Sequence, residues 1–176
     1  MPFTLLLQLL LFITPLTLAT PSRLNLTAIS SKNGASTLEC WQLTSPLITS
    51  TQAGTSGAAF TQLGATRNTS YAIIPAKFNG GLHNAPVVQY VAFLSGKAQI
   101  SLPNSTQEAT IYGGKEGLII AADTVNVSAK GHITVYPSER ETIAVQIPTA
   151  DGEVPPHTVL DQGSCKSRDL RSRKNA

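Results

Sequence analysis

The chain has few of the residues that usually carry out catalysis. Its 176 residues include three His, two Cys and one Trp, and only 13% are charged. The sequence has no Gly-x-Ser-x-Gly elbow, which argues against a serine hydrolase. It also has no P-loop, no Rossmann glycine pattern and no internal repeat, so no nucleotide-binding fold is predicted.

A helical period is missing too: no window of about a dozen residues repeats every 3.6 positions. Short runs rich in Val, Ile, Thr and aromatic residues are instead separated by turn residues. Phe93–Ala98 is typical of a tight hairpin with Gly96 at a positive φ, and 79–81 of a strand break. The pattern predicts an all-β sandwich or jelly roll with little helix. The expected strands are 38–48, 58–63, 70–74, 87–94, 98–102, 110–112, 117–122, 132–136 and 142–147.

The N-terminal residues indicate secretion. Leu5 to Leu18 is an apolar run that ends in Thr17-Leu18-Ala19, with small residues where a signal peptidase cleaves, so we expect 1–19 to be a signal peptide. A buried N-terminal helix is the alternative. The run is short for a bilayer, so no transmembrane segment is predicted and the localisation is expected to be extracellular. Four N-glycosylation sequons follow, at Asn25, Asn68, Asn104 and Asn126.

Cys40 and Cys165 are the only cysteines. In an oxidising compartment we expect them to form one disulfide. The ring would contain about 126 residues, for which chain entropy gives roughly 4 to 5 kcal/mol of stabilisation. Two buried free thiols or a metal-binding pair are the alternatives.

Basic charge is concentrated at the C-terminus. Five of the thirteen Lys and Arg residues lie in the last eleven positions, whereas the rest of the chain is close to neutral. We expect 20–165 to be one β domain and 166–176 to be a disordered basic tail. Contact of this tail with an anionic surface, such as acidic polysaccharide or lipid, is the alternative. No nucleic-acid partner is predicted, and the sequence does not set an oligomeric state.

One segment spaces polar residues as a metal-binding β-barrel does. His83, Ala85 and Gln89 differ by even numbers, so a strand would turn all three to one face. The spacing His83-x-Ala85-x3-Gln89-x6-Gly96 resembles the first motif of the cupin superfamily, His-x-His-x3-Glu-x6-Gly. Ala85 and Gln89 stand where the family has its second His and its Glu.

The second cupin motif, Gly-x5-Pro-x-Gly-x2-His-x3-Asn, aligns with Gly117 to His132. Asp123, Val125 and Ser128 replace its Pro, Gly and ligand His, and His132 falls at its Asn. From Leu38 to Pro137 the chain resembles small secreted cupin-like proteins of filamentous fungi. The resemblance implies a jelly roll with a pocket.

The replacements weaken the expected metal site. Ala85 offers no ligand and Gln89 only a neutral oxygen, so affinity for a divalent ion should fall steeply. We therefore predict no cofactor. If a divalent metal is bound, His83, Gln89 and His132 are the expected ligands.

The candidate pocket residues each have a structural alternative. His83 and His132 either line a pocket or have a structural role in their strands. Asp123 is either a turn cap or a general base. Trp41 and Tyr90 are core aromatics or an aromatic wall around a ligand. His157, which follows Val154-Pro155-Pro156, is expected in a surface loop. The predicted ligand-pocket set is His83, Gln89, Tyr90, Asp123 and His132.

Two classes of function follow from these residues. The first is an extracellular binding or interaction protein whose pocket takes a small organic or sugar-like ligand. The second is a cupin-type enzyme, either a metal-dependent oxidoreductase or a metal-free isomerase or cyclase that uses His83 and His132. Catalytic residues are not assigned, because the set of ligands is incomplete.

Overall fold

The computed structural model describes residues 22–103 and 105–170. These residues form thirteen strands and one short helix. The predicted all-β fold with little helix is confirmed. The elements are β1 (Arg23–Lys32), β2 (Ala35–Pro46), β3 (Ile48–Thr49), β4 (Ala59–Phe60), β5 (Ser70–Ile74), β6 (Phe78–His83), β7 (Gln89–Phe93), β8 (Lys97–Ser101), β9 (Glu108–Tyr112), β10 (Leu118–Ala121), β11 (His132–Tyr136), β12 (Thr142–Pro148), β13 (His157–Gln162) and α1 (Ser167–Leu170).

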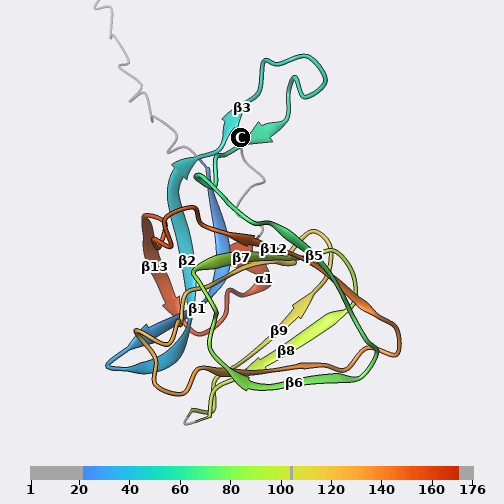
Figure 1. Ribbon diagram of the computed structural model, residues 1–176. Coiled ribbons are helices and arrows are strands. Elements are labelled where there is room, and N and C mark those ends of the chain that lie inside the picture. The colour runs from blue at the N-terminus through green and yellow to red at the C-terminus, as the bar shows by residue number, and fades with distance from the viewer. Residues whose placement is uncertain (1–21, 104, 171–176) are drawn as a thin grey trace, which may run out of the picture.

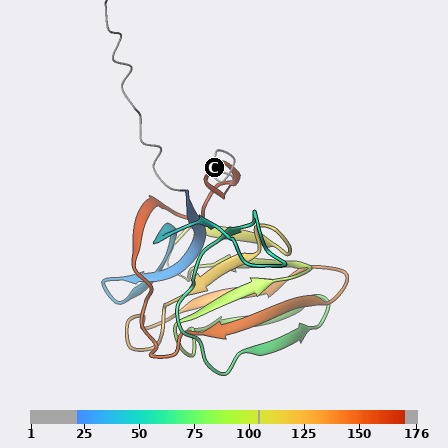
Figure 2. The same cartoon turned by 90° about the horizontal axis from the view of Figure 1, so that it is seen from above.

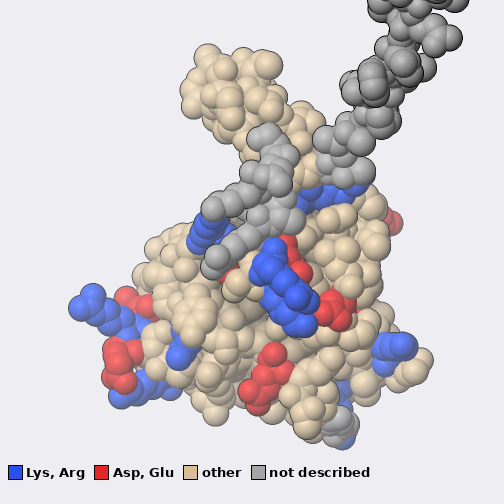
Figure 3. Space-filling model, turned by 180° about the vertical axis from the view of Figure 1, so that it is seen from behind, with Lys and Arg blue, Asp and Glu red and all other residues tan. Residues whose placement is uncertain are grey.

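Two sheets pack face to face as a jelly-roll-like sandwich (Figure 1, Figure 2). The larger has the strand order β13-β2-β1-β10-β7-β12-β5, and the smaller has the order β6-β11-β8-β9. Neighbouring strands are antiparallel except for β1 and β10, which are parallel. β3 and β4 form a separate two-stranded arm that projects from the sandwich (Figure 1). This arm carries no Lys, Arg, Asp or Glu, as the tan lobe in Figure 3 shows.

Strand alternation builds the core between the sheets. Ala98 and Ile100 of β8 and Ala109 and Ile111 of β9 are buried, whereas the residues between them are not. Such two-residue periodicity places one face of a strand inward. The opposite wall comes from the large sheet, through Ile29, Leu38, Val91, Phe93, Ile119 and Ala121.

The central strands of the large sheet are buried on both faces. Ile119, Ile120 and Ala121 of β10 are consecutive and all buried, which explains the continuous apolar run in the sequence. Ile120 belongs to a second core on the outer face, together with Leu26, Trp41 and Tyr90. Leu63 packs against this second core.

Three strands were not predicted. β1 has no uninterrupted apolar run, because buried polar residues such as Asn25 and Thr27 alternate with its apolar ones. β6 contains the expected break at 79–81, which is instead a bulge that leaves Gly80 out of the register with β11. β13 begins at His157, so the prediction of a loop residue is wrong: the His157 ring stacks on Trp41, with centroids 3.6 Å apart.

The predicted hairpin at Phe93–Ala98 is also wrong. β7 pairs with β10 and β12, while β8 pairs with β9 and β11, so this turn carries the chain from one sheet to the other. Gly96 does have a positive φ of 75°. A Cβ at this position would overlap Thr142, so the turn requires glycine.

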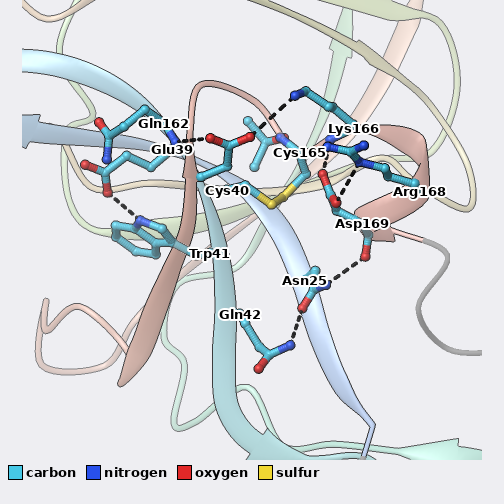
Figure 4. Close-up of a disulfide and its surroundings, with 12 residues drawn as sticks. Asn25, Glu39, Cys40, Trp41, Gln42, Gln162, Cys165, Lys166, Arg168 and Asp169 are labelled. Atoms are coloured by element: carbon cyan, nitrogen blue, oxygen red, sulfur yellow. Dashed lines mark hydrogen bonds and ion pairs between the residues drawn. A yellow bond between two sulfur atoms is a disulfide. The ribbon is translucent and has the colours of Figure 1, made fainter.

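Cys40 and Cys165 form the predicted disulfide (Figure 4). The bridge ties β2 to the segment that leads into α1. Lys166 to Leu170 were expected in the disordered tail, but Ser167–Leu170 form a helical turn whose Asp169 carbonyl accepts a hydrogen bond from Asn25. Residues 171–176 lie outside the described residues, as does the predicted signal peptide, 1–19.

The sequons differ in exposure. Asn25 is 4% exposed, and its amide donates to the Asp169 carbonyl at 2.7 Å and accepts from Gln42 at 3.0 Å. A glycan on the Asn25 amide would displace both of these hydrogen bonds. Asn68 and Asn126 are exposed, and Asn104 lies outside the described residues.

Within the part of the chain that the structure describes, no helix has the length and apolar character needed to cross a membrane.

Candidate functional site

A cavity of about 110 Å³ lies between the two sheets. Its apolar wall includes Ile29, Val91, Phe93, Ile100 and Ile119. Its polar lining comes from four strands: His83 of β6, Gln89 of β7, His132, Thr134 and Tyr136 of β11, and Gln146 of β12.

The strand register brings the two predicted histidines together. His83 pairs directly with His132 across β6 and β11, and their ring centroids are 4.5 Å apart. Gln89 joins them from the large sheet. Thr134 and Tyr136 share the parity of His132, so the alternation of β11 places all three toward the cavity. Thr134 and Tyr136 were not predicted as pocket residues, although the alternation of this strand in the sequence could have identified them.

Asp123 orients His132 from behind the cavity. Its carboxylate is fully buried and accepts a hydrogen bond from His132 Nδ1 at 2.7 Å. The Ser36 hydroxyl donates to the same oxygen at 2.7 Å, and the Ala85 N–H lies 3.4 Å from the other oxygen. Asp123 therefore neither lines the cavity nor caps an exposed turn. With Nδ1 held by the carboxylate, Nε2 is the ring nitrogen of His132 that remains for a ligand.

A second layer of hydrogen bonds holds this arrangement. Ser128 is hydrogen-bonded to Ser36 at 2.7 Å and accepts from the Gly131 N–H at 3.1 Å. The Asn84 amide donates to the carbonyls of Asp123 and Ser128, each at 2.9 Å. Ser36 and Asn84 were not predicted, because their partners are distant in sequence.

Gly131 allows β6 and β11 to meet. It has a φ of 74°, and a Cβ there would overlap the backbone carbonyl of His83. Only glycine combines this backbone conformation with so close an approach. The residue before His132 therefore sets the distance between the two histidine strands.

His83 lies at the exposed rim. Its Nδ1 is 3.0 Å from the Gly81 carbonyl, which can only accept, so Nδ1 carries the proton and Nε2 is free. The positive φ of Gly81, 67°, helps to turn the chain into this contact.

Gln89 and Thr134 are buried polar side chains that face the cavity. Their exposed fractions are 6% and 4%, and neither side chain hydrogen-bonds to another described residue. The fully buried side-chain atoms that lack a partner in the described chain are Ser22 Oγ and Thr142 Oγ1, and the polar atoms of Gln89 and Thr134, which line the cavity, are not among them. Both residues are therefore available to a molecule in the cavity.

Tyr136 adds a phenol to the same lining. Burial raises the pKa of Tyr136, because the phenolate would lose its solvation. The hydroxyl therefore stays protonated and can donate a hydrogen bond.

Tyr90, a predicted pocket residue, lies elsewhere. It follows Gln89 and so points to the opposite face of the large sheet, where it joins the outer core with Trp41. Its hydroxyl donates to the Leu63 carbonyl at 3.2 Å, and burial raises its pKa to about 12. It lines a different hollow of about 180 Å³, bordered by residues 62–65 and 149–156.

Among the residues that the structure describes, no group of three or more His, Cys, Asp or Glu side chains is placed to hold a metal ion. The alternative ligand set, His83, Gln89 and His132, does share one cavity. It supplies two imidazoles and a neutral amide, and the nearby carboxylate of Asp123 is already used by His132. This is a weak donor set for a divalent ion.

Comparison of the chain with family models, with curated proteins and with solved structures finds no match.

Proposed function

We propose that the protein is a secreted, cupin-like binding protein whose inter-sheet cavity takes a small organic or sugar-like ligand. One observation carries the proposal: Gln89 and Thr134 are almost fully buried, face the cavity and have no protein partner in the described chain. An apolar-walled cavity with a few convergent polar groups is the usual form of a ligand site.

The cupin assignment is supported by where its motif residues lie. His83 and Gln89 line one cavity of a β-sandwich, and Gly96 makes the turn that the motif places after them. Secretion is supported by the disulfide and by the exposure of Asn68 and Asn126.

The test is a ligand-observed NMR screen of small polar and sugar-like compounds, repeated with Gln89→Leu. We expect compounds that bind the unaltered protein to lose most of their affinity for this variant. Gln99→Leu is the matched control, because Gln99 is exposed on β8. A screen in which Gln89→Leu and Gln99→Leu bind every compound equally would place ligand binding outside this cavity.

An enzyme is the second candidate, and the Asp123–His132 pair favours it. A carboxylate that holds Nδ1 leaves Nε2 free to accept or donate a proton, and His83 is close enough to act as the second group. A metal-free isomerase or cyclase fits this arrangement better than a metal-dependent oxidoreductase. Product analysis of each bound compound decides the matter: conversion that disappears in His132→Gln establishes catalysis.

We also propose that the basic residues of 166–176 contact anionic surfaces outside the cell. The full-length protein should be retained on an acidic matrix at low salt and released as salt screens the attraction. Equal retention after removal of 171–176 would place the basic surface elsewhere.

A further inference from the structure

We propose that the ligand of the inter-sheet cavity is a short-chain carboxylate bound in its ionised form. This inference rests on the proposed function and names the chemical class of its ligand. It starts from the sign of the charge that the cavity can carry.

The charge of the lining can only be zero or positive near neutral pH. None of the described residues that line the cavity is Asp, Glu, Lys or Arg. The ionisable lining groups are His83, His132 and Tyr136, and the phenol of Tyr136 stays neutral because burial raises its pKa. Any charge gained therefore comes from an imidazole that accepts a proton.

Both imidazoles are hydrogen-bonded through Nδ1, which leaves Nε2 to interact with a ligand. Nδ1 of His83 faces the Gly81 carbonyl and Nδ1 of His132 faces the Asp123 carboxylate, at 3.0 and 2.7 Å. A proton taken up by either ring therefore goes to Nε2. The protonated ring offers an N–H donor with a positive charge, and such charge-assisted bonds to carboxylates are the stronger ones.

The neutral lining groups complete a donor set. The Gln89 amide, the Thr134 hydroxyl and the Tyr136 hydroxyl can each donate a hydrogen bond. A carboxylate accepts at both oxygens and has no proton to give. A cavity with several donors and no anionic lining group thus matches it better than it matches a cation.

Among the described residues, the carboxylate that contacts a cavity histidine is that of Asp123. Asp123 accepts from Ser36, Ala85 and His132, and it does not line the cavity. Among the described residues, the two rings contact each other, His132 contacts Asp123, and Tyr136 lines the same cavity.

The cavity volume limits the length of the acid. A cavity of about 150 Å³ takes benzene, which has six non-hydrogen atoms. The cavity here is about 110 Å³. It therefore fits a ligand of about four or five non-hydrogen atoms. Ile29, Val91, Phe93 and Ile119 would surround the apolar end of such an acid.

The test compares propionate with propionamide, which has the same shape but no charge. Isothermal titration calorimetry of the full chain should give about tenfold tighter binding of propionate at about pH 6, since one neutral hydrogen bond becomes charge-assisted. Propionate stays ionised down to about pH 5.5, since an ordinary carboxyl group has a pKa of about 4.

His83→Gln should reduce the preference for propionate, and His83→Gln combined with His132→Gln should abolish it, since amides keep hydrogen bonding but never gain charge. His157→Gln is the matched control, because His157 lies on β13 against Trp41 and does not line the cavity. It should keep the preference. Thr134→Val, which leaves both imidazoles in place, should weaken both compounds together.

Equal binding of the two compounds, or tighter binding of propionamide, overturns the carboxylate assignment while the binding function stands. If neither compound binds but other compounds respond to Gln89→Leu, the ligand class is wrong and the cavity still binds. If no compound at all responds to Gln89→Leu, the proposed function fails as well.

Discussion

Buried polar side chains occur both at the disulfide end of the sandwich and in the inter-sheet cavity, but the two regions differ in the hydrogen bonds that these side chains make. At the disulfide end these side chains have protein partners (Figure 4). The Glu39 carboxylate accepts from Trp41 Nε1–H at 2.6 Å, and Asn25 bridges Gln42 and the Asp169 carbonyl. The Thr27 hydroxyl accepts from the Cys165 N–H at 3.1 Å.

In the cavity, Gln89 and Thr134 are equally buried and have no such partner among the described residues. A satisfied buried hydrogen bond contributes to stability, whereas a polar group that faces the cavity without a protein partner contributes no such bond. The comparison separates a region that stabilises the fold from one that keeps its hydrogen-bonding capacity for another molecule. Substitutions in one region should therefore change stability, and matched substitutions in the other should change binding.

The largest effect is expected at the disulfide. Cys40→Ala with Cys165→Ala should lower the free energy of unfolding by about 4 to 5 kcal/mol, because the unfolded chain regains the freedom of a ring of about 126 residues. Denaturant unfolding measures the loss, and calorimetry should find propionate affinity unchanged in the folded protein. A variant with the same free energy of unfolding as the unaltered chain would show that the disulfide does not stabilise the fold.

The next effect compares two buried carboxylates. Asp123→Asn should lower the free energy of unfolding by about 3 kcal/mol, the upper range for hydrogen bonds to a charged group. Glu39→Gln should cost about 1 to 2 kcal/mol, because it keeps an acceptor for Trp41. Only Asp123→Asn should also weaken propionate, since His132 then loses its charged partner. Loss of affinity in both variants would mean that the cavity responds to general destabilisation.

Alanine substitutions at two glycines with positive φ give a further matched comparison. Gly131 and Gly163 have φ values of 74° and 96°, but only a Cβ at Gly131 meets backbone atoms within 4 Å. Gly163→Ala should cost about 1 kcal/mol for its backbone conformation, and Gly131→Ala about 2 kcal/mol or more because β6 and β11 must also separate. NMR shifts of the His83 and His132 rings should change only in Gly131→Ala. Unchanged ring shifts in that variant would contradict the role of Gly131 in setting the histidine spacing.

Much of this fold can be predicted from the sequence. Strands such as β7, β10 and β11 are rich in Val, Ile and aromatic residues, and the spacing of His83 and Gln89 places them on one face. The disulfide follows from a count of two cysteines in a chain whose sequence predicts secretion. The strands and the shared face depend on residues that are close in sequence. The disulfide could be predicted because two cysteines allow one pairing.

The missing parts depend on tertiary pairing. Ser36 contacts Asp123 across 87 positions, so no local pattern links them. β6 forms despite its glycines, because pairing with β11 outweighs local propensity. Asp123 ends an apolar run, which resembles a turn cap, and only the fold shows that His132 and Ser36 enclose it.

The smallest expected change in stability comes from a matched pair of threonines, and it tests the central claim most directly. Thr27 and Thr134 are 3% and 4% exposed, and valine has nearly the shape of threonine. Thr27→Val should lower the free energy of unfolding by about 1 kcal/mol and leave propionate affinity unchanged, because it removes a satisfied hydrogen bond. Thr134→Val should leave stability unchanged or raise it, and should weaken binding several-fold. If Thr134→Val destabilises the fold as much as Thr27→Val and leaves affinity unchanged, the cavity residues are structural and the account is wrong.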